Sequence, residues 1–338
     1  MQFWIRLRWS RGSLMDEKLI IKKYFKPLAS NRYSLHLKDD VACINVEDKK
    51  NIIANQDSLV MGTHFFKSDD PTFIAKKSLR VNLSDLISKG VTPYGYFMSI
   101  AMDNTIDERW IQLFSKGLAE DQKKYNISLF GGDTVSAPKG LFITINMIST
   151  TNDGIIARNG ASDGDNIYAT GSIGSSAIGL HLIKNKNDNF GLSQPDIKNL
   201  IRKYHLPNPK LKTIKLIKKF ASSSMDTTDG LFNDLLILAE ASGRSFFIDK
   251  RSIPYSVSAK KFLSKNGDFD IALYGGDDFE VIFTSPSSFE NKLLDYAKKI
   301  KLRITKIGDV GGLSKNPRLF DHKHEEIKSS NYTFKHFK

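Results

Sequence analysis

The chain has very little cysteine, since Cys43 is the only one among its 338 residues. A disulfide framework and a cysteine-rich metal site are therefore both excluded, and the composition suits a reducing compartment such as the cytoplasm. Long apolar runs are also missing, because no stretch approaches the roughly 20 residues that a membrane-spanning helix needs. The sequence therefore predicts a cytoplasmic protein that neither spans a membrane nor depends on disulfides.

Arg-rich blocks interleaved with aromatic side chains, which are typical of nucleic-acid-binding proteins, are absent as well. The formal net charge is nevertheless +13, from 50 basic and 37 acidic residues. The lysines are scattered or fall on one side of predicted helices, as in KLKTIKLIKKF at 210–220, where apolar residues recur at helical spacing. We interpret the positive charge as a solvated surface and expect no nucleic-acid partner.

What the sequence has instead is aspartate placed repeatedly beside apolar segments. In KDDVACI, Asp39 and Asp40 precede a predicted strand, where adjacent like charges are unfavourable unless a cation compensates them. Further aspartates fall at predicted strand ends or helix starts: Asp57, Asp85, Asp133, Asp226, Asp229, Asp277 and Asp278. One such aspartate is commonly a helix cap or a turn residue. The whole set indicates carboxylates that converge on several hard divalent cations, of which Mg²⁺ typically joins carboxylates to phosphates.

The nucleotide-binding motifs of many other α/β proteins are missing. Gly171, Gly174 and Gly179 lie between a predicted strand and a predicted helix, but their spacing is not G-x-G-x-x-G and no Gly-Lys-Ser/Thr follows. A tight turn that opens a helix is the simpler interpretation, although the N-terminus of that helix could face an anion. The glycines of Gly-Gly-Asp at 131–133 and 275–277 could let backbone N–H groups approach a phosphate. These features indicate phosphoryl transfer carried out mainly by metal ions.

The predicted strands and helices divide the chain into two domains. Residues 1–14 are basic and aromatic but lack the features of a signal peptide, so we interpret them as a tail or a start-site artefact. Residues 15–153 form the expected N-terminal domain, and a Gly-, Asn-, Ser- and Asp-rich linker at 154–164 leads to a C-terminal domain at 165–338. SLFGGDTVS and ALYGGDDFE each look like an apolar strand that runs into Gly-Gly-Asp, as two similarly built α/β units would produce.

Six segments that occur in order carry a family resemblance: DDVA, QDSLVMGTHF, KSLRVNLSDLISKGVTP, FGGDT, SMDTTDGLFNDL and GGDDFEVIFT. From about Met15 to its end, the chain resembles the thiamine-monophosphate kinases. This family belongs to a wider group of ATP-utilising enzymes that includes aminoimidazole ribonucleotide synthetase and selenophosphate synthetase. The resemblance implies an α+β fold with two α/β-sandwich-type domains. The N-terminal mixed-sheet domain would bind ATP and metal, and the C-terminal domain would be of the aminoimidazole ribonucleotide synthetase-like type.

The resemblance also implies a reaction, the ATP-dependent phosphorylation of thiamine monophosphate to thiamine diphosphate by direct transfer with several Mg²⁺ ions. No side chain is expected to act as acid or base, because the acceptor is an already ionised phosphate oxygen and positioning and charge neutralisation dominate. The family further implies a homodimer that pairs its N-terminal domains. Two alternatives stay open. One is a synthetase-like ligase of the same superfamily, which GTHF and GGDDFE disfavour, and the other is a basic nucleic-acid-binding protein, which leaves the aspartates unexplained.

Carried over motif by motif, the family's metal ligands fall on Asp40, Asn55, Gln56, Asp57, Asp85, Asp133, Asp226 and Asp229. Its ATP contacts fall on Gly132, Asp133, Arg158 and Thr228, and its contacts with thiamine phosphate fall on His64, Asp277 and Phe334. Four positions depart from the family pattern: Lys38 stands in place of Gly, Asn55 and Gln56 in place of Ser-Thr, and Asp277 in place of Glu. A backbone carbonyl at Gln56 would survive its change, and an aromatic face at Phe334 suits a cationic thiazolium.

Overall fold

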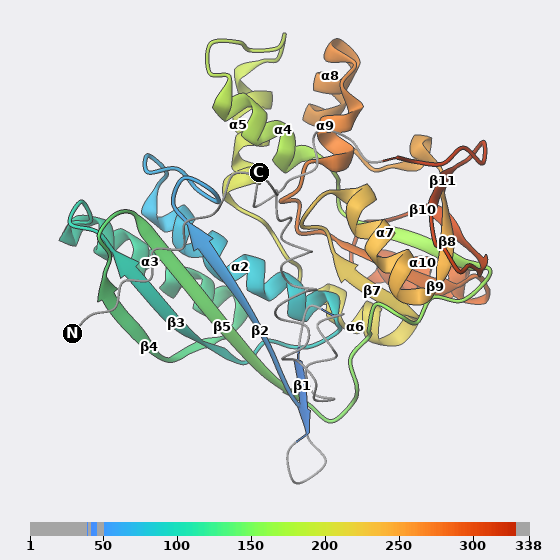
Figure 1. Cartoon of the computed structure of the whole chain (residues 1–338), viewed down its shortest axis with the longest axis horizontal. Coiled ribbons are helices and arrows are strands. Elements are labelled where there is room, and N and C mark those ends of the chain that lie inside the picture. The colour runs from blue at the N-terminus through green and yellow to red at the C-terminus, as the bar shows by residue number, and fades with distance from the viewer. Residues whose placement is uncertain (1–38, 40–41, 46–50, 329–338) are drawn as a thin grey trace, which may run out of the picture.

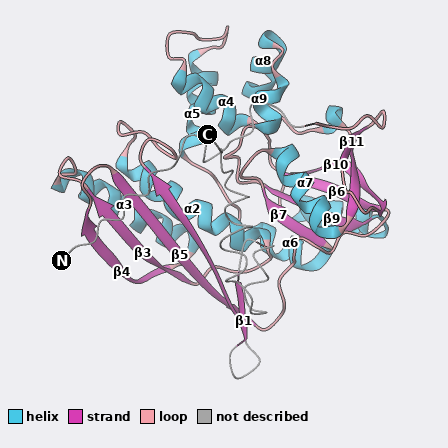
Figure 2. Ribbon diagram, viewed as in Figure 1, coloured by secondary structure: helices cyan, strands magenta, loops and turns pink. Residues whose placement is uncertain are grey.

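Two mixed β-sheets with helices packed against them make up the protein (Figures 1 and 2). The computed structural model describes residues 39, 42–45 and 51–328. The predicted tail at 1–14, the candidate ligand Asp40 and the candidate substrate contact Phe334 lie outside the described residues. The expected α+β class with two sheet-based units is confirmed.

The first sheet has five strands in the spatial order β1 (Ala42–Asn45), β2 (Asn51–Val60), β5 (Leu141–Thr151), β3 (Gly95–Met102) and β4 (Ser128–Ser136). Only β3 and β4 are parallel to each other. Helices α2 (Pro71–Ser88) and α3 (Glu108–Tyr125) lie on one face of this sheet (Figure 1). Alternate residues of β5, among them Ile143 and Ile145, are buried under the helices, whereas Phe142 points to the other face and is exposed.

The second sheet has six strands in the spatial order β11 (Leu319–Asp321), β8 (Arg244–Ile248), β10 (Ile304–Leu313), β6 (Asp165–Thr170), β9 (Val281–Pro286) and β7 (Ser223–Asp226). Its helices are α4 (Ser175–Lys184), α5 (Gln194–His205), α6 (Lys212–Phe220), α7 (Leu231–Ser242), α8 (Val257–Asn266), α9 (Phe269–Tyr274) and α10 (Glu290–Lys299). Two short 3₁₀ helices cover Lys250–Ser252 and Ser287–Phe289. The predicted helix within 210–220 is confirmed, and its apolar side is buried as the spacing indicates.

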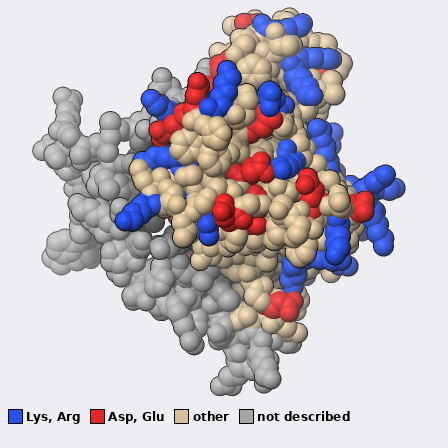
Figure 3. All heavy atoms as spheres, turned by 90° about the vertical axis from the view of Figure 1, so that its right-hand side faces the viewer, with Lys and Arg blue, Asp and Glu red and all other residues tan. Residues whose placement is uncertain are grey.

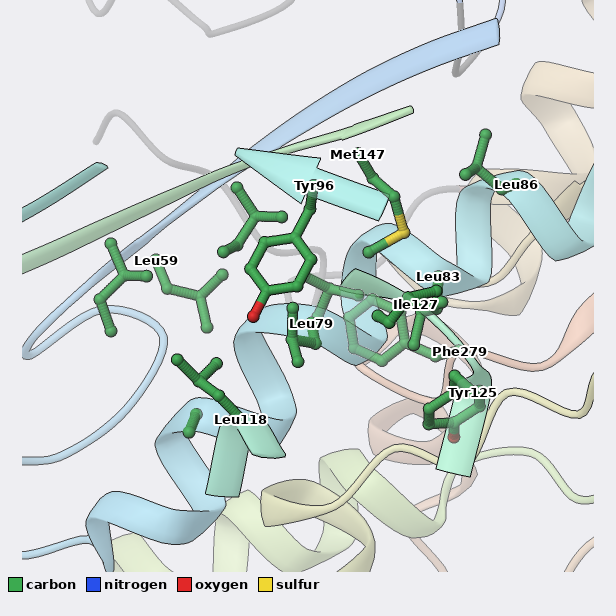
Figure 4. Packing of buried hydrophobic residues seen from close by; sticks show 14 of the residues in the cluster. Leu59, Leu79, Leu83, Leu86, Tyr96, Leu118, Tyr125, Ile127, Met147 and Phe279 are labelled. Atoms are coloured by element: carbon green, nitrogen blue, oxygen red, sulfur yellow. The ribbon is translucent and has the colours of Figure 1, made fainter. Parts of the chain in front are cut away.

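Helix α2 joins the two halves of the molecule. Asp70 caps its first turn by accepting a hydrogen bond from the Thr72 backbone N–H at 2.7 Å, and Gly90 follows its end with a φ of 74°. The helix packs on β2 and β5 and also on α6 and β7 of the second half. In Figure 4, Phe279 from the second half lies in the same apolar cluster as Leu83 of α2. Because α2 is covered on both sides, its polar side chains are buried and need partners.

Three positions differ from the predicted local structure. The second Gly-Gly-Asp does not follow a strand, because residues 269–274 form α9, whose first turn Asp268 caps through the Ile271 N–H. Asp57 lies inside β2 and Asp85 inside α2, so neither is at the end of its element. The first difference has a simple reason: a short apolar run is compatible with a buried strand and with a buried helix, and the cap at Asp268 decides for the helix.

The surface carries charges of both signs. On the face shown in Figure 3, lysine and arginine side chains are interspersed with aspartate and glutamate. Such a mixture is typical of a solvated surface and differs from the continuous basic stripe of a nucleic-acid-binding face. Among the described residues, no helix is both long and apolar enough to cross a bilayer.

Candidate active site

A cavity of about 600 Å³ lies between the two halves of the molecule. Its walls come from β2 and α2 of the first half, and from α4, α9 and the loops at 228–229 and 275–279 of the second. Seven of the predicted site residues line it: Gln56, Asp57, His64, Asp85, Thr228, Asp229 and Asp277. Segments that are more than 200 residues apart in the sequence thus contribute to one space.

Three carboxyl groups stand close enough to affect one another at one end of this cavity: that of Asp226, which is buried, and those of Asp57 and Asp85, which are half-buried. Burial raises the pKa of Asp57 and of Asp226 to about 6 each. Burial, followed by the negative charges of Asp57 and Asp226, raises the pKa of Asp85 well above the ordinary carboxyl value. These three groups repel when ionised, so an additional cation would stabilise their charged forms.

The oxygen atoms at this end suit a hard cation. Among the described residues, neither carboxylate oxygen of Asp226 nor the Oδ1 of Asn55 makes a hydrogen bond of good geometry, although the Ser84 hydroxyl lies close enough to Asp226 to oppose the rise in its pKa. The Asn55 Nδ2 donates to Asp85 Oδ2 at 2.6 Å, which fixes the amide orientation. Within the described ranges, no three His, Cys, Asp or Glu side chains are close enough to hold one ion alone. Mg²⁺ commonly completes its shell with waters and substrate phosphates, so two carboxylates with such oxygens fit it.

The loop that carries Thr228 and Asp229 is held by a carboxylate that the motif comparison missed. Asp234 Oδ2 accepts hydrogen bonds from the backbone N–H groups of Thr228 at 2.9 Å and Asp229 at 3.2 Å. Burial, followed by the charges of Asp229 and Asp226, raises the pKa of Asp234, and the positive charge of Arg158 opposes the rise. The signal in the sequence is a carboxylate on the helix start GLFNDLL, which is apolar apart from Asn233 and Asp234.

At the other end of the cavity, a carboxylate has a cationic partner. Lys77 Nζ lies 2.8 Å from Asp277 Oδ2 and 3.0 Å from the carbonyl oxygen of His64. The same ammonium group lies 3.8 Å from the centre of the Tyr204 ring, whose hydroxyl donates to the His64 carbonyl at 3.0 Å. The His64 Nδ1 accepts a hydrogen bond from the Val60 N–H at 2.9 Å, so its neutral ring carries the hydrogen on Nε2.

Gly132 and Asp133 do not line the cavity of their own chain. The register pairs Asp133 with Ser99 and Gly132 with Met98, and Met98 and Asp57 both pair with Ile145 of β5. Directly paired residues share a face and successive residues alternate, so Asp133 points to the face opposite Asp57. It is also three strands away, roughly 14 Å at the usual strand spacing. The contacts of Gly132 and Asp133 with ATP and metal remain predictions.

The N-terminus of α4, which could have faced an anion, is closed by a side chain of the same protein. Asp278 accepts hydrogen bonds from the backbone N–H groups of Gly174 at 2.5 Å and Ser176 at 3.2 Å. Burial raises the pKa of Asp278 to about 7, while these two hydrogen bonds favour the charged form. Since its N–H groups already have a carboxylate partner, this helix start is a tight structural turn.

Comparisons with known proteins show to which proteins this chain is similar. Residues 38–151 match the family model described as "AIR synthase related protein, N-terminal domain". The thiamine-monophosphate kinase of Escherichia coli K12 is 33% identical over 269 residues, covering 79% of this chain and 82% of that protein. The enzyme of the same name from Buchnera aphidicola of Acyrthosiphon pisum is 35% identical over 324 residues, covering 94% and 98%. A solved structure described as "AaThiL complexed with AMPPCP and TMP" superposes with a TM-score of 0.85 at 26% identity, covering 98% and 100%.

Proposed function

The chain belongs to the thiamine-monophosphate kinase family, and we propose that it transfers the γ-phosphoryl group of ATP to thiamine monophosphate to give thiamine diphosphate. The similarity to such kinases extends over most of the chain, and the structure solved with AMPPCP and TMP shares its fold at a TM-score of 0.85. The observation that carries the proposal is the group of Asp57, Asp85 and Asp226 beside the cavity, with buried oxygens that make no hydrogen bond of good geometry among the described residues.

We further propose that Mg²⁺ ions are held at this end by Asp57, Asp85 and Asp226, with Asp229 and the Asn55 oxygen nearby. When bound, such ions would neutralise the triphosphate and the charge that develops in the transferred group. Gln56 would contribute only its backbone carbonyl, because its side chain alternates away from Asp57 along β2. The ligand role of Asp40 stays a prediction outside the described residues.

The chain's own residues would position the two substrates. The charge of Arg158 lies near Asp226 and Asp234, and Thr228 lines the cavity beside them. Arg158 and Thr228 are therefore proposed to bind the phosphates of ATP. His64, whose neutral ring carries its hydrogen on Nε2, and Asp277, which contacts Lys77 as the His64 carbonyl does, both line the cavity and are proposed to hold the phosphate of thiamine monophosphate. Holding acceptor and donor phosphates together in one enclosed space is the main contribution that such a site makes to the rate.

We propose a homodimer that pairs the faces of the first sheet that carry no helix. Phe97, Val135 and Phe142 share this face by register and are 42%, 49% and 42% exposed. Exposed apolar side chains grouped on one sheet face typically mark an interface. Asp133 points to the same face, so pairing would bury it near the second copy. Light scattering should report a dimer for the parent and a monomer for Phe142→Asp.

The reaction is tested by coupling ADP release to a spectroscopic readout, with thiamine monophosphate as acceptor. Aminoimidazole ribonucleotide precursors serve as the comparison, since they are the substrates of the synthetase-like alternative. ADP release that depends on thiamine monophosphate and on Mg²⁺ supports the proposal. Turnover only with the precursors, or salt-sensitive nucleic-acid binding without turnover, contradicts it.

We also propose a cytoplasmic location for the protein, which is supported by the presence of only one cysteine in the chain.

A further inference from the structure

Lys77 is a buried lysine whose charge bridges the two halves of the molecule. Its side chain is only 4% exposed, and it reaches from α2 to the loop at 275–279, where it meets Asp277 at 2.8 Å. A buried ammonium group is costly unless it is paired and hydrogen-bonded. The Lys77–Asp277 ion pair lies at the wall of the cavity, where it can affect a bound ligand.

The partners of Lys77 are the residues proposed to hold thiamine phosphate. Besides Asp277, the ammonium group donates to the carbonyl oxygen of His64 at 3.0 Å and lies over the Tyr204 ring. The Tyr204 hydroxyl donates to the same His64 carbonyl at 3.0 Å. One lysine therefore fixes the backbone behind the His64 ring and, at the same time, the carboxylate of Asp277.

The backbone of Asp277 is also fixed in an unusual conformation. Its φ of 70° lies in the left-handed region, which is uncommon for a residue with a side chain and which aspartate adopts more readily than most. The Asp277 N–H donates to the Thr228 carbonyl at 2.9 Å, which ties this loop to the adjacent loop at 228–229. With Oδ2 held by Lys77, the remaining oxygen of Asp277 is the one that a ligand in the cavity can use.

We propose that Lys77 is a positioning residue that orients Asp277 for thiamine monophosphate and so sets the affinity for this acceptor and not for ATP. The inference rests on the proposed kinase function and adds a residue to it. Lys77 acts through Asp277, because it restricts the rotation of the carboxylate and balances its charge. Thiamine monophosphate then meets a carboxylate that is already ordered, and binding costs no further side-chain entropy at this residue.

The test is a double-mutant cycle on the Michaelis constants, with Lys77→Met, Asp277→Asn and the double variant. Each single change should raise the Michaelis constant for thiamine monophosphate about tenfold or more, as expected for the loss of one charge-assisted hydrogen bond. The constant for ATP should change by less than about twofold, because the ATP end of the cavity keeps its contacts. The double variant should fall well short of the product of the two single effects, because most of the Lys77 effect passes through that carboxylate and only its hydrogen bond to the His64 carbonyl is independent of it.

Lys210→Met is the matched control. Lys210 Nζ pairs with Glu280 Oε2 at 3.0 Å, so this variant breaks an ion pair three residues from Asp277 without touching the lining of the cavity. It should leave both Michaelis constants unchanged, and Lys77→Arg, which keeps the charge, should lie closer to the parent than Lys77→Met does. If Lys77→Met fails to fold, the double variant, from which both charges are gone, is compared directly with Asp277→Asn.

The outcomes distinguish a failure of the proposed role of Lys77 from a failure of the proposed kinase function. If the parent does not phosphorylate thiamine monophosphate, both are overturned. If the parent is active and Lys77→Met leaves its Michaelis constant unchanged, or raises that for ATP equally, only the inference is overturned. Additive effects in the cycle, or the same effect from Lys210→Met, would likewise show that Lys77 merely stabilises the loop.

Discussion

The negative charges of the carboxylates are compensated differently at the two ends of the cavity. The acidic end, formed by Asp57, Asp85 and Asp226, holds carboxyl groups that repel one another and whose pKa values burial raises. At the paired end, Asp277 meets the ammonium group of Lys77 at 2.8 Å. The paired end is electrostatically complete in the folded chain, whereas the acidic end needs cations from outside.

Both ends are organised by the same helix. Lys77 and Asp85 lie eight residues apart on α2, which corresponds to roughly 12 Å along the helix axis at the usual rise per residue. Their opposite charges therefore face different parts of one cavity, on a rigid element buried on both sides. The difference supports the proposal that the acidic end receives metal and phosphates and that the paired end orients thiamine monophosphate.

The largest effect is expected from Asp85→Asn at the acidic end. Turnover should fall on the order of a hundredfold or more, because a charge-stabilising group is lost. Without metal, relief of repulsion should leave the variant at least as stable as the parent; with Mg²⁺ and ATP, the parent should gain more in melting temperature. Thermal melting and the kinase assay check this. A variant that melts far lower without metal yet turns over normally would show Asp85 to be a structural residue.

A smaller and more selective effect is expected from His64→Asn at the paired end. The Asn oxygen can still accept the Val60 N–H in place of Nδ1, while the Nε2–H that we propose as a donor to phosphate is lost. The Michaelis constant for thiamine monophosphate should rise about tenfold, in line with one hydrogen bond to a charged group. That for ATP should stay near the parent value in steady-state kinetics. An equal rise for ATP would place His64 on the nucleotide side instead.

Asp278→Asn removes a carboxyl group that belongs to neither the acidic end nor the paired end of the cavity. Its folded-state pKa of about 7 lies above the ordinary value of 3.8, so its favourable contribution to stability is complete at low pH and is lost as pH rises through about 7. The parent should therefore lose more melting temperature than the variant between pH 5 and pH 8, with or without Mg²⁺. Parallel pH profiles for the two proteins would show that Asp278 does not titrate in this range.

No measurable effect is expected from removing residues 1–14. They carry none of the motifs, and Met15 precedes a sequence that opens a helix well. A protein that starts at Met15 should keep the turnover and the melting temperature of the full chain. A large loss in either quantity would assign the segment a part in the fold or in the site.

The motifs in the sequence predicted much of the acidic end. Asp57, Asp85 and Asp229 line the cavity with Asp226 beside them, as expected of aspartates next to close-turning residues. The sequence did not indicate Lys77, because a lysine on a helix is usually solvated and its partner lies 200 residues further along the chain. A pairing between distant segments depends on tertiary packing, which no local pattern records.

Local ambiguity explains the other differences. ALY before the second Gly-Gly-Asp is short and apolar, so periodicity could not distinguish a strand from the helix α9. The side of the sheet to which Asp133 points follows from the register of β4, which shifts where Tyr96 and Phe97 of β3 pair with Leu129 and Gly131 and Phe130 of β4 is left unpaired. A shift of one residue turns side chains to the opposite face, and the sequence alone did not indicate it.

The most direct measurement is a crystal structure of the protein with Mn²⁺ in place of Mg²⁺ and a non-hydrolysable ATP analogue, recorded with anomalous scattering from the metal. We expect anomalous peaks within about 2.2 Å of carboxylate oxygens of Asp57, Asp85 and Asp226, a distance typical of oxygen ligands to such ions. The Lys77–Asp277 pair should be without a peak. Analogue bound with no metal at the three aspartates, or metal at Asp277 instead, would contradict the division of the cavity into an acidic and a paired end.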